Sequence, residues 1–253
     1  MGVGHALRRA IQGAGLDVTR FPIGEPVHYL VKQLHSHQVT CVLDVGANAG
    51  HYAGELRRFG YRGRIVSFEP LAEAFRRAEQ ASRHDPHWRV LPYALGPETG
   101  LRMMNVAGNS GHSSSFLAML DAHRKVAPEA AYVASEQVAE RTLDAVWDDV
   151  ATAEDVVFLK LDVQGYERYV LDGARMALER EGITGIQLEL SLVPLYEGAW
   201  LYDDAIAWAH GEGFRLFGVY PGFTDRNGGQ MLQADALFFR SSSANGSLRG
   251  SAR

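Results

Sequence analysis

Short apolar runs and amphipathic segments alternate along most of the chain. Five apolar runs are typical of strands buried on both faces, at residues 40–45, 64–68, 88–93, 156–161 and 186–190. Helical patterns lie between or after them, at residues 50–59, 70–83, 166–180 and 201–212. We expect Pro70 in the first turn of its helix, where a missing N–H is tolerated. The alternation predicts a doubly wound, mostly parallel α/β sheet.

The two ends of the pattern differ from this centre. Two further strand patterns, 214–220 and 234–240, have no helical pattern between them, so we expect a C-terminal antiparallel hairpin completing a seven-stranded sheet. Helical patterns at 2–14 and 27–37 predict an N-terminal helical cover over residues 1–38. The main domain is then 39–240, and the Ser/Gly/Arg-rich residues 241–253 predict a disordered tail.

The middle of the chain is less regular. Residues 101–106 and 133–140 have extended patterns, and Thr142 is placed to cap a helix at 143–150. Residues 107–130 form a long loop, in which residues 116–125 have a helical pattern. A loop of this length in a compact domain is usually functional or mobile.

Composition narrows the class of protein. The 253 residues are 46% hydrophobic and 22% charged, which is typical of a globular chain. The net charge of −5 disfavours nucleic acid as a partner. The single cysteine, Cys41, allows no internal disulfide and fits a core thiol in the reducing cytoplasm. We expect no membrane span and no signal peptide, and a homodimer is compatible with the sequence.

The turn that follows the first predicted strand carries the clearest candidate chemistry. Asp44 ends the strand, and Gly46 and Gly50 let the backbone approach a ligand closely. Asn48 occupies the place of the second glycine in a dinucleotide-binding motif, and the Lys-Ser/Thr of a phosphate loop is absent. Glu69, at the end of the second strand, can accept both hydroxyls of a ribose. The alternative is that Asp44 and Glu69 only cap the helices that follow them.

These residues resemble the FkbM family of class I S-adenosylmethionine-dependent methyltransferases. The resemblance covers about residues 40–240, and its members are typically O-methyltransferases acting on natural products, sugars or glycolipids. The matching stretches are 42–52, 66–70, 93–95, 109–116, 141–144, 158–167, 171–174 and 186–189.

The resemblance implies a Rossmann-like fold and S-adenosylmethionine as cofactor. Asp44 would lie near the amino group of the cofactor, Glu69 at its ribose, and Pro70, Tyr93 and Ala94 at its adenine. The turn beneath the methionine part would include Gly46, Ala47, Asn48 and Gly50.

The end of the fourth strand is the second candidate site. Lys160 and Asp162 point to the same face, and Lys160 could pair with a carboxylate or steer an anion. Because an alcohol must lose its proton to accept a methyl group, Asp162 is the first candidate for base or metal ligand. Glu189, at the end of the fifth strand, is the second, and the two carboxylates could hold Mg²⁺. The alternative is that Asp162 contacts only the cofactor and Glu189 is a structural acid.

Three polar positions and two loops remain. Gln164 could line the same site, and His112 is a third candidate base. Ser113 and Ser114 could contact cofactor or substrate. Residues 194–200 and 220–223 supply aromatic side chains, either for an acceptor pocket or for core packing.

The sequence therefore predicts a cytoplasmic S-adenosylmethionine-dependent O-methyltransferase acting on a small-molecule hydroxyl. The alternatives are an N-methyltransferase and a catalytically inactive binding module of the same fold. A nicotinamide oxidoreductase is disfavoured by Asn48 in the place of the middle glycine.

Overall fold

A computed structural model describes residues 25–179 and 182–240. The helix expected at 2–14 and the tail at 241–253 lie outside these residues. No helix in the described ranges is both long enough and apolar enough to cross a bilayer.

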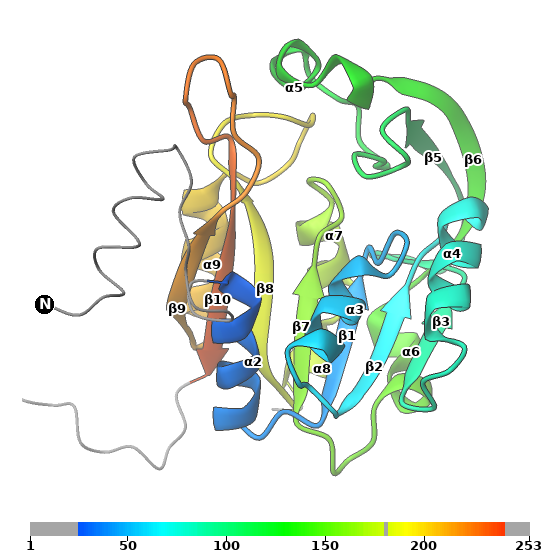
Figure 1. Ribbon diagram of the computed structural model, residues 1–253, viewed down its shortest axis with the longest axis vertical. Helices are drawn as coiled ribbons and strands as arrows, with labels where there is room; N and C mark the ends of the chain where they lie inside the picture. Colours follow the sequence, from blue (N-terminus) through cyan, green and yellow to red (C-terminus); the bar gives the residue numbers. More distant parts are fainter. Residues whose placement is uncertain (1–24, 180–181, 241–253) are drawn as a thin grey trace, which may run out of the picture.

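A seven-stranded sheet forms the centre of the molecule (Figure 1). Its strands, in spatial order, are β3 (Trp88–Leu91), β2 (Arg64–Phe68), β1 (Cys41–Val45), β7 (Val157–Leu161), β8 (Ile183–Ser191), β10 (Gln233–Arg240) and β9 (Phe214–Pro221). The first five are parallel, and β10 is antiparallel to both of its neighbours. The predicted doubly wound sheet and its C-terminal hairpin are both confirmed.

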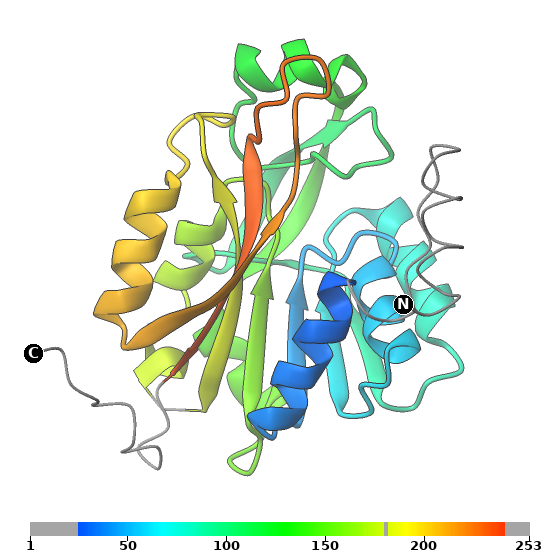
Figure 2. The ribbon, with the colours of Figure 1, turned by 60° about the vertical axis from the view of Figure 1, so that its left-hand side comes forward.

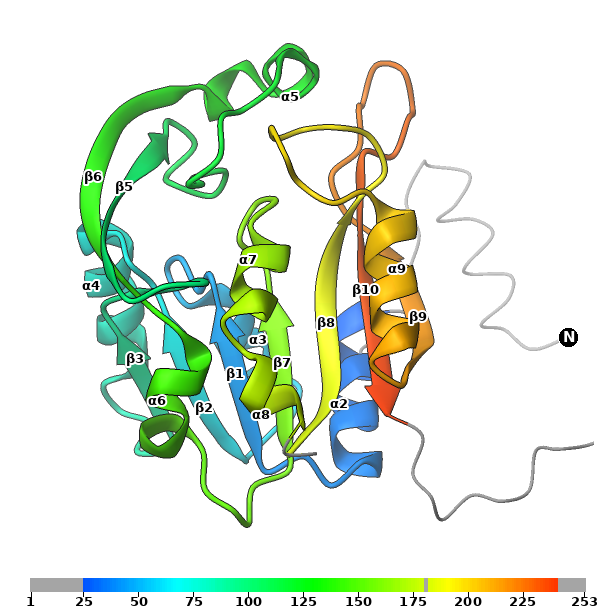
Figure 3. The ribbon, with the colours of Figure 1, turned by 180° about the vertical axis from the view of Figure 1, so that it is seen from behind.

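Helices cover both faces of this sheet (Figures 1 and 3). One face carries α2 (Pro26–Ser36) and α3 (His51–Arg58), and α4 (Ala72–Ser82) packs along β3. The opposite face carries α6 (Leu143–Val150), α7 (Glu167–Asp172), α8 (Arg175–Glu179) and α9 (Tyr202–Gly211). Strands β1 and β7 are fully buried and β2 and β8 nearly so, as their unbroken apolar runs predict, whereas the edge strands β3 and β9 are partly exposed.

Each face has its own apolar core. On the first, Leu30, Val31 and Leu34 of α2 pack against side chains from four strands: Val42, Ile65, Phe158, Leu237 and Phe239. On the second, Leu43 and Leu159 pack beneath the helices of that face. Because α2 shares a core with the sheet, it is joined to the main domain by packing.

The predicted helix at 166–180 is wrong in one respect, because the structure divides it into α7 and α8 at Gly173. A Cβ at Gly173 would overlap the backbone carbonyl oxygen of Gly96. The Asp144 carboxylate accepts hydrogen bonds from the N–H groups of Met176 and Ala177. These bonds satisfy N–H groups in the first turn of α8, so α8 starts as a separate helix. A contact from a distant segment thus overrides the local helical pattern.

The predicted position of Pro70 is also wrong, because α4 begins only at Ala72. Leu71 is the N-cap residue and is extended, with φ −75° and ψ 124°. Its N–H donates to Glu69 Oε1 at 2.9 Å, which holds residues 69–71 in an extended path before the helix starts.

A second, three-stranded sheet was not expected. It contains β4 (Ala94–Leu95), β6 (Tyr132–Arg141) and β5 (Gly100–Ala107), with β5 and β6 antiparallel. The connection between β5 and β6 includes α5 (Asp121–Val126) and a 3₁₀ turn at Pro128–Ala130. We call residues 100–141 the arm; it curves over the carboxyl ends of the central strands (Figures 1 and 2).

Candidate active site

The turn after β1 is built from residues with left-handed backbone conformation. Gly46, Asn48 and Gly50 have φ values of +78°, +47° and +83°. A Cβ at Gly46 would overlap the carbonyl oxygen of Asp162, so only glycine lets this turn approach the end of β7. Two candidate segments far apart in the sequence therefore meet through the backbone.

Glu69 ties this turn to the end of β2. Its Oε2 accepts the N–H of Asn48 at 2.8 Å and its Oε1 accepts the N–H of Leu71 at 2.9 Å. Burial raises the pKa of the Glu69 carboxyl to about 7, although both backbone donors act in the opposite direction. Each carboxylate oxygen keeps a further lone pair with which to bind a hydroxyl.

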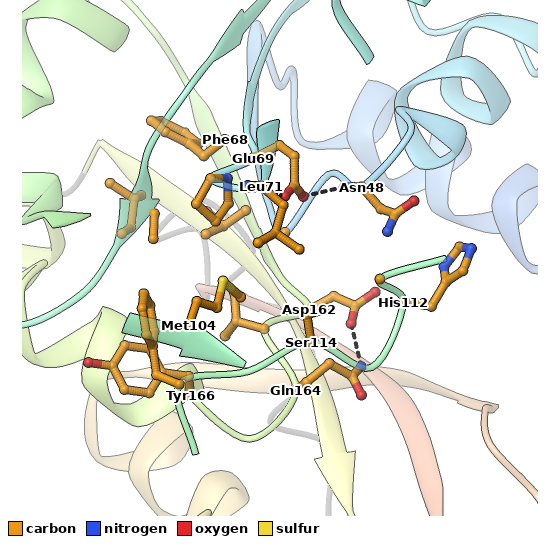
Figure 4. A pocket seen from close by; sticks show the side chains of 18 residues that line it. Asn48, Phe68, Glu69, Leu71, Met104, His112, Ser114, Asp162, Gln164 and Tyr166 are labelled. Atoms are coloured by element: carbon orange, nitrogen blue, oxygen red, sulfur yellow. Dashed lines mark hydrogen bonds between the residues drawn. The ribbon is translucent and has the colours of Figure 1, made fainter. Parts of the chain in front are cut away.

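A cavity opens between this turn, the ends of β2, β4 and β7, and the arm (Figure 4). We call it the first cavity. One part of its wall is polar, with Asn48, Glu69, Asp162 and Gln164. Another part is apolar and includes Leu71, Leu95, Met104, Phe116, Val163 and Tyr166. Such a site suits a ligand that joins a flat apolar ring to a hydroxyl-rich or charged part.

Most of the predicted cofactor residues line the first cavity: Gly46, Asn48, Glu69, Pro70, Ala94, Ser114, Asp162 and Gln164. Five lie elsewhere. Asp44 and Ala47 are buried beside the turn, and the Trp88 ring lies where a Gly50 side chain would be. Tyr93 packs on Phe68 and Arg141, while Ser113 faces a second cavity.

Asp44 is fully buried and paired with a cation. Lys160 Nζ lies 3.1 Å from Asp44 Oδ1 and 3.6 Å from Asp162 Oδ2, and it also donates to the Gly46 carbonyl oxygen. Burial acts to lower the pKa of Lys160, but the charges of Asp44 and Asp162 raise it overall, so the lysine is charged. Of the two roles considered for Lys160, the structure shows the ion pair.

The two candidate bases converge on one amide. Gln164 Nε2 donates to Asp162 Oδ1 at 2.9 Å and to Glu189 Oε2 at 2.8 Å. Gln233 donates to the same Glu189 oxygen at 2.7 Å, and the Tyr196 hydroxyl donates to Gln164 Oε1 at 2.8 Å. Burial, together with the charge of Asp162, raises the pKa of Glu189 well above its usual range. Glu189 is therefore protonated more readily than an exposed glutamate.

A second cavity lies beside the first and shares Asp162, Gln164 and His112 with it. The arm forms one of its walls, with Asn109, Ser113, His123 and Glu129. The β9–β10 connection forms another, with Phe223, Asp225, Arg226 and Asn227. Glu189 lines only the second cavity, so Asp162 is the carboxylate that faces both. The exposed ring of His112 lies at the same junction and stacks on His51, with centroids 6.2 Å apart.

Backbone strain concentrates at this junction. Of the four non-glycine residues with positive φ in the described ranges, Asn48, Ser110 and Gln164 belong to the loops around the first cavity. Each such residue costs about 1 kcal/mol or more, and strain of this kind gathers where a fold positions ligand-binding groups.

The loop at 194–200 divides between two locations. Tyr196 is buried beneath the second cavity and bonds Gln164, whereas Trp200 packs on Trp208 on the side where α9 lies. Gly222 and Phe223 of the hairpin line the second cavity. His123 is not among the predicted site residues, because the only sequence signal in that part of the arm is a helical pattern.

The carboxylate pair does not fit a shared metal ion. The Gln164 amide nitrogen bridges the two carboxylates, and its N–H groups are donors rather than metal ligands. Within residues 25–179 and 182–240, no group of three or more His, Cys, Asp or Glu side chains is arranged to hold a metal ion.

Comparison with known proteins gives one family and several structures. A model of the methyltransferase FkbM domain matches residues 44–216. A solved TehB-like SAM-dependent methyltransferase from Corynebacterium glutamicum is 14% identical, with a TM-score of 0.41 over 94% of this chain and 97% of that one. No curated protein matches the chain.

Two O-methyltransferase structures are also similar. A putative O-methyltransferase from Klebsiella pneumoniae is 9% identical, with a TM-score of 0.49 over 94% of this chain and 89% of that one. A putative caffeoyl-CoA O-methyltransferase from Staphylococcus aureus is 8% identical, with a TM-score of 0.47 over 95% of this chain and 93% of that one.

Proposed function

The chain belongs to the FkbM methyltransferase family, and we propose that it methylates a hydroxyl of a small molecule such as a natural product, sugar or glycolipid. S-adenosylmethionine supplies a methyl group bound to a positively charged sulfur. Methyl transfer needs an oxygen nucleophile in line with that bond and a group to receive the hydroxyl proton.

The first cavity is the proposed cofactor site. Glu69 would accept the ribose hydroxyls, and the apolar wall with Leu71, Leu95 and Phe116 would hold the adenine. The mixture of a buried carboxyl with an apolar slot fits this cofactor, whose parts differ in the same way. Asp44 would act indirectly, by holding Lys160 beneath the turn.

Asp162 is the proposed base, and its position carries the proposal. It lines both cavities, and its side chain is 42% exposed while its partner Lys160 is buried. A hydroxyl bound in the second cavity could therefore deliver its proton to Asp162 next to the cofactor site. Glu189 would remain a hydrogen-bonding neighbour, held by Gln164 and Gln233. His112 is the alternative base at the same junction.

One observation supports the alternative of N-methylation. Four carboxylates line the second cavity against a single guanidinium: Asp162, Glu189, Glu129 and Asp225 against Arg226. Such a wall attracts a protonated amine as well as a neutral polyol. Mass spectrometry of the methylated product distinguishes an ether from a methylamine.

Substitution Asp162→Asn tests the role of the base. We expect the rate of labelled methyl transfer from S-adenosylmethionine to a panel of alcohols to fall at least about 100-fold, the usual contribution of a general base. The Kd for S-adenosylhomocysteine should change only a few-fold, because the substitution preserves the shape of the cavity wall. Calorimetry and steady-state kinetics separate the two effects.

Asp235→Asn is the matched control. Asp235 is a nearby half-buried acid bonded to Gln187 that lines neither cavity, so turnover should be nearly unchanged. Near-normal turnover in Asp162→Asn would remove Asp162 as the base. Cofactor binding without transfer to any acceptor would favour the inactive binding module.

A further inference from the structure

His123 is a buried polar side chain with little to bind inside the protein. It belongs to α5 in the arm, lines the second cavity and is only 2% exposed. No hydrogen-bond partner lies within reach of its Nδ1 among the described residues, and its Nε2 lies 3.4 Å from Ser113 Oγ. Ser113 Oγ already accepts a hydrogen bond from Asn109 at 2.9 Å.

Such a residue lowers the stability of the folded chain unless a ligand binds it. An unsatisfied buried donor or acceptor loses its hydrogen bonds to water without replacement, so each one in a folded protein needs an explanation. The aromatic packing of His123, on Tyr196 and Phe223 with ring centroids 5.3 and 5.1 Å apart, does not require a nitrogen. A phenyl ring of similar shape would pack at least as well.

We propose that His123 is a specificity-determining residue that hydrogen-bonds a second hydroxyl of the acceptor, which is therefore a polyol. The inference rests on the proposed function, in which the reacting hydroxyl lies at Asp162 in the same cavity. Rotation of the imidazole about its Cβ–Cγ bond is soft, so the ring can present a nitrogen to the ligand while it keeps its aromatic packing.

The chemical state of the ring agrees with a hydroxyl ligand. Burial lowers the pKa of His123, against the opposing charge of Glu129, so the imidazole is neutral at physiological pH. A neutral imidazole has one donor and one acceptor nitrogen, and a hydroxyl has the same two capacities. An anionic group would meet Glu129 and Asp225 in this cavity and is disfavoured.

His123 is also connected to the proposed base. Its ring packs on Tyr196, the Tyr196 hydroxyl donates to Gln164, and Gln164 donates to Asp162. An acceptor that is bonded to His123 is thereby fixed against the wall that leads to Asp162. Binding at one hydroxyl would then select which other hydroxyl reaches the base.

Substitution His123→Phe tests the proposal by two independent measurements. In the protein without ligands, the Tm should rise by about 2–4 °C, because an unsatisfied polar group is replaced by an apolar ring of similar shape. With an acceptor that the wild type methylates, KM for the acceptor should rise at least tenfold, while kcat and the Kd for S-adenosylhomocysteine change less than twofold.

His37→Phe is the matched control for stability. His37 also packs on an aromatic ring, that of Phe239 at 3.9 Å, but its Nδ1 is bonded to the Gln33 carbonyl oxygen at 3.0 Å. Its replacement should therefore give no rise in Tm. A fall in Tm for His123→Phe would show that His123 is a satisfied core residue and would overturn the proposal, as would a rise in Tm with an unchanged KM.

A binding measurement separates this proposal from the proposed function. Imidazole ¹⁵N resonances are followed while methyl α-D-glucopyranoside is added to the protein loaded with S-adenosylhomocysteine. A shift at His123 that is absent at His37 supports polyol binding, even if no alcohol is methylated. No shift at His123 overturns the proposal, whereas absence of turnover with every alcohol counts against the methyl transfer alone.

Discussion

At the scale of single residues, Glu69 is unusual because its carboxyl is buried and has a raised pKa. Its carboxyl is 5% exposed, and burial raises its pKa to about 7. The carboxyl is therefore about half protonated at neutral pH. In the proposed role it accepts two hydroxyl protons in hydrogen bonds, which only the ionised form can do fully.

This predicts a link between cofactor binding and proton release. Because the bound state needs ionised Glu69, the affinity for S-adenosylhomocysteine should fall about tenfold per pH unit below about pH 7 and level off above it. Calorimetry at pH 6 in buffers of different ionisation enthalpy should show the proton released. In Glu69→Gln the release should disappear; an equal release in this variant would contradict the assignment.

The sequence is sufficient to predict which residues lie together where they stand at strand ends, while their roles stay predictions. Gly46, Glu69 and Asp162 line the first cavity, because consecutive parallel strands end at one edge of a sheet. His123 and Tyr196 could not be found in the same way. They lie in connections outside the strands, and their importance depends on contacts with Ser113, Phe223 and Gln164 that no local pattern encodes.

At the scale of elements, Gly173 shows where a periodic pattern misleads. The apolar positions over 166–180 have helical spacing, yet Gly96 approaches Gly173 so closely that a continuous helix with a side chain there is excluded. The backbone of Gly173 itself is ordinary, with φ −88° and ψ 6°. Contact, and not conformation, therefore requires the glycine.

Two glycine substitutions should then have opposite effects on stability. Gly173→Ala should destabilise the protein by about 1–3 kcal/mol, since the backbone of residues 96 and 173 must separate. Gly54→Ala, in helix α3 with open space around its Cβ position, should stabilise it by about 0.5–1 kcal/mol. Urea denaturation measures both, and equal signs would show that the contact with Gly96 is unimportant.

The second sheet marks the limit of element-scale prediction. The extended patterns of β5 and β6 and the capped helix α6 are confirmed, including the bond from Ala145 N–H to Thr142 at 3.1 Å. That β5 and β6 pair with each other and with β4, and not with the main sheet, depends on long-range register. Periodicity identifies strands but not their partners.

At the scale of the whole molecule, the sites lie at one end of the fold. The arm and the β9–β10 connection, about 100 residues apart in sequence, both lie above the central strands (Figures 1 and 2). Residues of both line the second cavity. The central sheet, packed on both faces by helices, thus forms the scaffold that supports these two segments. Specificity for the acceptor would then depend on the arm and the β9–β10 connection, which can vary in sequence while the sheet and its helices stay the same.

Ligand binding at this end should stabilise the entire domain. S-adenosylhomocysteine at 100 times its Kd should add about 2.7 kcal/mol, or roughly 5–10 °C in Tm for a domain of this size. NAD should give no shift, because Asn48 and the turn around it lack the glycine pattern of a dinucleotide site. Differential scanning fluorimetry checks both; stabilisation by NAD alone would revive the oxidoreductase alternative.

The burial of Cys41 in strand β1 has a practical consequence. It is the only cysteine in the sequence, it has no exposed surface, and burial raises its pKa to about 11. A thiol in this state is neutral and sheltered from reagents. Because Cys41 is unreactive, a cysteine introduced at an exposed position of the arm becomes the single reactive thiol of the chain. A fluorophore or spin label attached there can report whether the arm moves relative to the sheet.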